Sequence, residues 1–104
     1  MTAQPLLVFD FDGVIVDGMA EYWWSAWMAA QRLNAEPQGL GPDAVPQGFR
    51  RLRPWVHHGW EMVLLAAEMP QLDPERWVVD YATEQAMALQ RRGWDASRLQ
   101  EALD

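Results

Sequence analysis

The chain has 104 residues, half of them hydrophobic and seven of them Trp, so it is expected to fold as one domain with a modest core. A net charge of −7 opposes binding to a phosphate backbone, and nucleic acid is not expected as a partner. Cysteine is absent, which excludes a disulfide framework, a thiol nucleophile and a thiolate metal site.

The hydrophobic residues are not gathered into a membrane segment. No stretch approaches the roughly 18 apolar residues that a transmembrane helix needs. Residues 1–5 lack the basic region of a signal peptide, and the apolar run after them is short. We therefore expect a soluble, cytoplasmic protein that does not bind membranes.

Two aspartates one residue apart, Asp10 and Asp12, follow the apolar residues 6–9 and precede Gly13. A bounded apolar run of this length is typical of a buried strand in a parallel sheet, and α/β sheets bind ligands where such strands end. Because side chains alternate along a strand, the two carboxylates would share a face and reach one ligand. The alternative is a turn whose aspartates cap the next helix.

A paired carboxylate at such a place suits phosphate chemistry. A carboxylate attacks phosphorus only when a divalent cation masks the negative charge of the phosphate. Mg²⁺ prefers oxygen ligands, which Asp10 and Asp12 offer. Gly13 allows the backbone to turn sharply and to approach a ligand closely. The residues therefore predict a magnesium and phosphate site.

Helical spacing of apolar residues predicts a helix over residues 18–33. The glycines and prolines of residues 34–47 predict a loop. Pro54 suits the first turn of a helix over residues 54–68, and Pro70 ends it.

The C-terminal third is predicted to be helical as well. Asp73, followed by Pro and Glu, predicts a second helix start, and that helix should continue to the Arg-Arg pair before Gly93. Asp95 is expected to cap a short last helix. Residues 77–79 could form a second strand, but the helix start before them favours a helix. The count is one strand and about four helices.

The stretch Asp-Phe-Asp-Gly-Val-Ile-Val-Asp at residues 10–17 resembles the first signature motif of the haloacid dehalogenase-like (HAD) hydrolases. The resemblance implies an α/β, Rossmannoid fold, represented here by one strand and about four mainly cap-domain helices with an incomplete core. It divides the chain into a first core strand and catalytic loop, residues 1–17, and a helical cap portion, residues 18–104.

The other motifs of that family have no match in the chain. Its third motif is typically a lysine, and all eight basic residues here are arginines. Its second motif needs Ser or Thr at a strand end, whereas these residues lie at the terminus or on predicted helices. We therefore expect a fragment of a longer hydrolase, with a second chain that supplies the missing core as the alternative. The chain alone is expected to be inactive.

The resemblance implies a magnesium-dependent phosphatase that acts on a small phosphorylated metabolite through an aspartyl-phosphate. Asp10 would be the nucleophile and a Mg²⁺ ligand. Asp12 would be the general acid and base, and its backbone carbonyl would bind the metal. Phe11 and Gly13 would line the phosphate loop. Asp17 would either cap the next helix or take part in catalysis.

The predicted helices contain three further candidate features. Arg50 and Arg53 are assigned to substrate binding, because guanidinium groups suit phosphate, although a solvated basic face is the alternative. Glu61 could reach into a cleft, but with the two histidines before it there are too few ligands for a metal site. Trp24 falls off the apolar stripe of its helix and could face a cleft or a partner.

Two alternative functions stay open. The run from Asp12 to Asp17, with Ala20-Glu21-Tyr22 after it, also resembles sugar-phosphate mutases of the same family. The chain could instead be a non-catalytic helical module that interacts through its Trp-rich faces.

Overall fold

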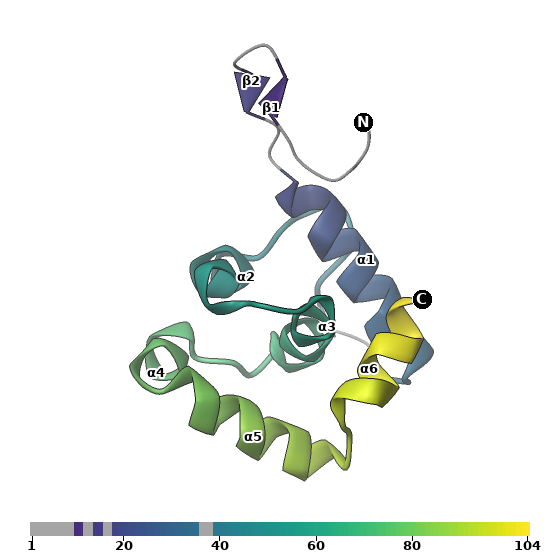
Figure 1. Ribbon diagram of the computed structural model, residues 1–104, viewed down its shortest axis with the longest axis vertical. Coiled ribbons are helices and arrows are strands. Elements are labelled where there is room, and N and C mark those ends of the chain that lie inside the picture. Colours follow the sequence, from purple (N-terminus) through teal and green to yellow (C-terminus); the bar gives the residue numbers. More distant parts are fainter. Residues whose placement is uncertain (1–9, 12–13, 16–17, 36–38) are drawn as a thin grey trace.

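The computed structural model describes residues 10–11, 14–15, 18–35 and 39–104, whose arrangement is shown in Figure 1. Two short strands come first, β1 (Asp10–Phe11) and β2 (Val14–Ile15). The rest of the described chain is built on helices: α1 (Met19–Arg32), α2 (Gln47–Leu52), the 3₁₀-helix η2 (Arg53–Trp55), α3 (Gly59–Glu68), α4 (Pro74–Val79), α5 (Tyr81–Arg92) and α6 (Ala96–Leu103).

The predicted α/β Rossmannoid fold is wrong for the described part of the chain, which is a body of packed helices. Its two strands pair with each other in antiparallel register, with Asp10 opposite Ile15, so they belong to no parallel sheet. Only two residues separate these strands in the sequence, and parallel strands need a crossover connection of a dozen or more residues. The strand predicted at residues 6–9 lies outside the described residues.

The centre of the helical body is formed by α1, α3 and α6, which pack against one another. Residues 63–68 of α3 are all buried. A helix of ten residues is marginal in water, so this burial supplies most of its stability. Trp23 of α1 is fully buried, and its ring meets Phe49 of α2 edge to face at 5.1 Å between centroids. Arg32 Nη1 donates to the Ala102 carbonyl at 2.6 Å, which fastens the end of α1 to α6.

The first predicted helix is confirmed, since α1 lies within one residue of the expected ends. The loop after it is confirmed over residues 39–46, which contain no helix or strand. Two indole groups of α1 hold this loop in place. Trp23 Nε1 donates to the Gly41 carbonyl and Trp27 Nε1 to the Leu40 carbonyl, each at 2.9 Å.

The single helix predicted over residues 54–68 is wrong, as is the extension of the loop to residue 47. The chain forms α2 first, and Pro54 lies inside η2. Val56 and His58 then have extended backbone angles, with ψ of 128° and 147°, so the helical path is interrupted before α3 begins. Glu61, the third residue of α3, accepts the His58 backbone N–H and thereby caps the new helix.

The C-terminal helix signals are confirmed at three points. Asp73 caps α4, Asp95 caps α6, and Gly93 ends α5 with a left-handed φ of 67°. The prediction of one helix between Asp73 and Gly93 is wrong. The backbone of Asp80 is not helical, with φ of −152° and ψ of 76°, and it separates α4 from α5. The Asp80 carboxylate accepts the Thr83 backbone N–H at 3.3 Å and so caps the second of these helices.

None of the described helices has both the length and the apolar character needed to cross a membrane.

Candidate functional site

The predicted aspartate site lies just before α1. Asp10 and Phe11 form β1, and Gly18 is the N-cap residue of α1. In Figure 1 the two paired strands lie beyond the N-terminal end of α1. The remaining residues assigned to this motif lie outside the described residues: Asp12, Gly13 and Asp17. The phosphate and magnesium roles given to this motif therefore stay predictions.

The arginines of the predicted substrate site have different surroundings. Arg50, in α2, is exposed. Arg51 pairs with Glu75, with 3.1 Å between Nε and Oε2. Arg53 instead places its guanidinium over the ring of Tyr22 in α1, at 4.9 Å from the centroid. Within the described part of the chain no carboxylate pairs with Arg53, whereas the charge of Arg51 is compensated by Glu75.

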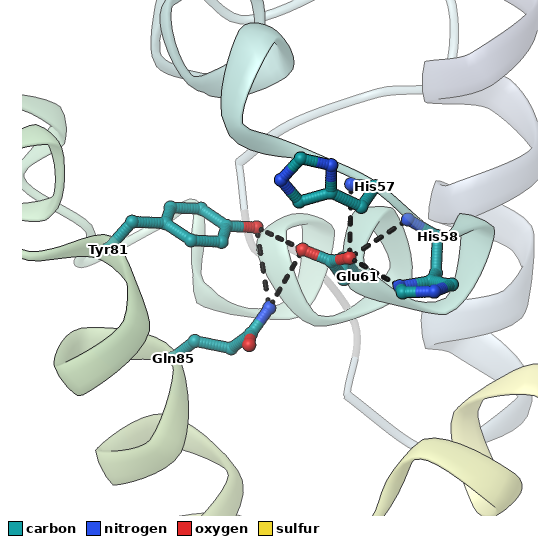
Figure 2. Close-up of polar contacts among 5 residues, drawn as sticks. All are labelled: His57, His58, Glu61, Tyr81 and Gln85. Atoms are coloured by element: carbon teal, nitrogen blue, oxygen red, sulfur yellow. Dashed lines mark hydrogen bonds and ion pairs between the residues drawn. The ribbon is translucent and has the colours of Figure 1, made fainter.

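The most extensive polar cluster in the described chain surrounds Glu61, whose residue is only 4% exposed. Figure 2 shows its carboxylate between α3 and α5. Oε2 accepts the backbone N–H groups of His57 and His58 at 3.1 and 2.8 Å and lies 3.0 Å from His58 Nδ1. Oε1 accepts the Tyr81 hydroxyl and the Gln85 side-chain amide, each at 3.0 Å.

This environment sets the protonation states of the cluster. Burial alone would raise the pKa of Glu61, but the hydrogen bonds that its carboxylate accepts together lower that pKa below its ordinary value. Burial raises the pKa of Tyr81, and the neighbouring Glu61 charge raises it further. Glu61 is therefore a carboxylate at neutral pH, and Tyr81 is a neutral hydroxyl that donates to it.

Through these contacts Glu61 connects α3 with α5 and with the residues before α3, and we call such a contact a carboxylate clamp. A carboxylate offers about four lone-pair positions, and the five polar contacts of Glu61 occupy them. The structure thus holds Glu61 inside the helical body, whereas the sequence had suggested a cleft. His57 contributes its backbone N–H to this cluster. No group of three or more possible ligands that could hold a metal occurs in the described part of the chain.

A second buried carboxylate, Glu68, lies two helical turns further along α3. Its Oε1 is 2.7 Å from Arg91 Nη2, and its Oε2 is 2.5 Å from Arg92 Nε. Arg92 also donates to the Ala67 carbonyl at 3.0 Å and lies over the ring of Trp94. Residues seven apart share one face of a helix, so Glu61 and Glu68 attach the same neighbour, α5, at two points.

Trp24, which falls off the apolar stripe of its helix, is exposed in the structure. Its residue is 52% exposed and forms part of the wall of an open cavity beside α1. The other tryptophans of α1, Trp23 and Trp27, point their indole N–H groups into the loop over residues 39–46.

No protein-family model, curated protein or solved structure matches the chain. Its function is therefore inferred from the motif and from the geometry described above.

The carboxylate clamps were largely missed from the sequence. The sequence suggests Glu61 only as a cleft residue and Glu68 only as the end of a helix. A signal was present, since both glutamates lie at buried positions of an otherwise apolar helix, where a charge requires partners. Their partners on α5 are 20 to 24 residues away, and no local spacing indicates such a contact.

Proposed function

We propose that the chain supplies the nucleophile loop and the substrate-contacting helices of a magnesium-dependent phosphatase for small phosphorylated metabolites. The proposal rests on the residue pattern around Asp10 and Asp12 and on the position of Arg53 beside α1. Mg²⁺, held by these two aspartates, would neutralise the charge of the phosphate. The proposal includes the cytoplasmic setting expected from the sequence.

The reaction would proceed in two balanced steps. A carboxylate oxygen of Asp10 bonds to phosphorus while the ester P–O bond breaks, and Asp12 gives its proton to the leaving oxygen. Asp12 then takes a proton from water, whose oxygen attacks phosphorus and releases Asp10 and inorganic phosphate. The backbone of Phe11 and Gly13 would line the phosphate loop during both steps.

The single observation that carries the proposal is the stacking of Arg53 on Tyr22. The motif ends at Asp17, α1 begins at Met19, and Tyr22 lies within the first turn of that helix. A guanidinium over a ring is held there by cation–π attraction, while its N–H groups remain able to bind oxygens. Arg53 is thereby held beside the helix end that follows the motif, where its positive charge would attract a phosphate ester.

The proposal requires groups that this sequence does not contain. A lysine that steadies the nucleophile is absent, because every basic residue is an arginine. A core on a longer polypeptide or on a second chain would supply it. The chain alone is therefore not expected to turn over substrate, and the test is aimed at the first chemical step.

The test is phosphorylation of the purified chain by an acyl phosphate, with and without Mg²⁺. We expect intact mass spectrometry after acid quenching to show one added phosphoryl group that depends on Mg²⁺ and is lost in Asp10→Asn. Arg53→Met should lower the rate of phosphorylation, whereas the matched variant Arg51→Met should not, because Arg51 is already paired with Glu75. A folded chain that gains no phosphoryl group, or an Asp10→Asn variant that gains it equally, would refute the proposal.

A further inference from the structure

An open cavity of about 400 Å³ lies between α1 and the loop that follows it. Its size is within the range of small-molecule sites. Trp24 is the aromatic residue of its lining, and Ala20 and Ser25 beside it have small side chains. Six residues line the cavity: Ala20, Glu21, Trp24, Ser25, Pro42 and Asp43.

Both walls of this cavity are fixed. One wall is the helix α1 itself. The other is the loop, whose Leu40 and Gly41 carbonyls are bound by the indole N–H groups of Trp27 and Trp23. The indole N–H of Trp24 makes no hydrogen bond within the described chain, and this residue is half exposed, whereas Trp23 and Trp27 hold the loop. The cavity is therefore present before any ligand arrives, which lowers the entropic cost of binding.

The acidic residues that line the cavity favour a positively charged ligand. Glu21 and Asp43 both line it, and neither is paired with a cation of the described chain. The glutamates of α3 and Glu84 are, in contrast, each matched by a donor or an arginine. Glu21 lies in the first turn of α1, where a helix dipole favours a carboxylate, and Asp43 lies in a turn of the loop, where Asp is common. An anion would be repelled from this cavity, and a cation would be attracted.

We propose that the cavity binds a small organic cation, with an alkylammonium group on the indole face of Trp24 between the carboxylates of Glu21 and Asp43. An ammonium group is attracted to the face of Trp by the ring quadrupole, and its alkyl substituents gain by contact with the same surface. This inference does not depend on the proposed phosphatase activity, since none of its residues belongs to the aspartate motif.

The test is a titration of the ¹⁵N-labelled full chain with choline chloride, at an ionic strength matched by sodium chloride. The neutral isostere 3,3-dimethylbutan-1-ol is titrated in parallel. The indole N–H signal of Trp24 is assigned by its loss in Trp24→Phe. We expect choline to shift this signal saturably and the isostere to bind more weakly. Trp24→Ala should weaken choline binding by about two- to fivefold, the contribution of a cation on an exposed ring.

The charge contribution is tested with the double variant Glu21→Gln and Asp43→Asn, which should weaken choline binding and reduce its salt dependence. Glu101→Gln removes an exposed carboxylate on α6 and serves as the matched control, with no change expected. Unchanged indole signals of Trp23 and Trp27 show in each variant that the loop is still attached to α1.

Three results would overturn the inference: no saturable shift with choline, equal affinity for the isostere, or full affinity in the double variant. Failure of the phosphatase proposal would be seen separately, because Asp10→Asn should leave choline binding unchanged.

Discussion

Replacement of Glu61 by Gln tests whether the buried carboxylate stabilises the helical body. The variant keeps the shape of the side chain but removes its charge and gives it an NH₂ group. On one side of the carboxylate the partners include two backbone N–H groups that cannot reorient. On the other side, the Tyr81 hydroxyl and the Gln85 amide can rotate, so we expect the new NH₂ group to face them.

The cost then comes mainly from the lost charge. Hydrogen bonds to a charged group contribute about 1.5–3 kcal/mol each, and neutral ones about 0.5–1.5 kcal/mol. Because the donors on the fixed side keep a neutral oxygen partner, we expect Glu61→Gln to lower the free energy of unfolding by about 2 kcal/mol. Glu101→Gln, at an exposed site on α6, should change it by less than about 0.5 kcal/mol.

The assay is urea unfolding followed by circular dichroism at a series of pH values. Since the pKa of Glu61 is lowered in the folded state, its stabilisation is fully present above the ordinary value of 4.5 and is lost as the pH falls through the folded pKa. The difference between the wild type and Glu61→Gln should therefore be constant near neutral pH and shrink below pH 4.5. A variant as stable as the wild type at neutral pH would refute the reasoning, as would a difference that persists in strong acid.

Three other substitutions test the remaining contacts by the same unfolding assay. Glu68→Gln should destabilise the chain by about 2 kcal/mol, because two guanidinium groups lose their charged partner, and a wild-type midpoint would count against the second clamp. Gly93→Ala should cost about 1 kcal/mol at its left-handed φ of 67°, whereas Gly41→Ala, with no atom within 4 Å and no such φ, should cost less; equal effects would contradict this. Asp95→Ala should cost about 1 kcal/mol by removing the cap of α6, and no loss of stability would show that the cap contributes nothing.

The helix ends that the sequence predicted well are those set by local chemistry. Asp73 and Asp95 accept backbone N–H groups two or three residues ahead, and Gly93 ends α5 because it tolerates a positive φ. Such signals lie within a few residues of the helix end. The break before α3 was missed because Pro54 fits the first turn of a long helix and of a 3₁₀-helix equally well.

The fold class was wrong for a different reason. The α/β fold was inferred from one predicted strand and the motif that follows it, at one end of the chain. A parallel sheet needs a second strand that is distant in the sequence. In the described residues, β1 pairs with β2 only two residues later, so the pairing is local. Of the candidate site residues, Arg53 contacts Tyr22, which lies 31 positions earlier, so this contact could not be predicted from local spacing, and the substrate-binding role of Arg53 stays a prediction.

The attachment of α5 has a consequence for how the molecule opens. Ala88 is the one fully buried side chain of this helix, which lies along the edge of the body in Figure 1. The carboxylates of Glu61 and Glu68 in α3 therefore contribute much of the attachment of α5, which in other helices comes from an apolar face. We expect α5 to detach by sub-global opening while α1, α3 and α6 stay packed, so that its amide hydrogens exchange with solvent before theirs do. Acid should widen this difference in exchange rate, because protonation of Glu61 weakens the attachment and leaves the apolar core unchanged.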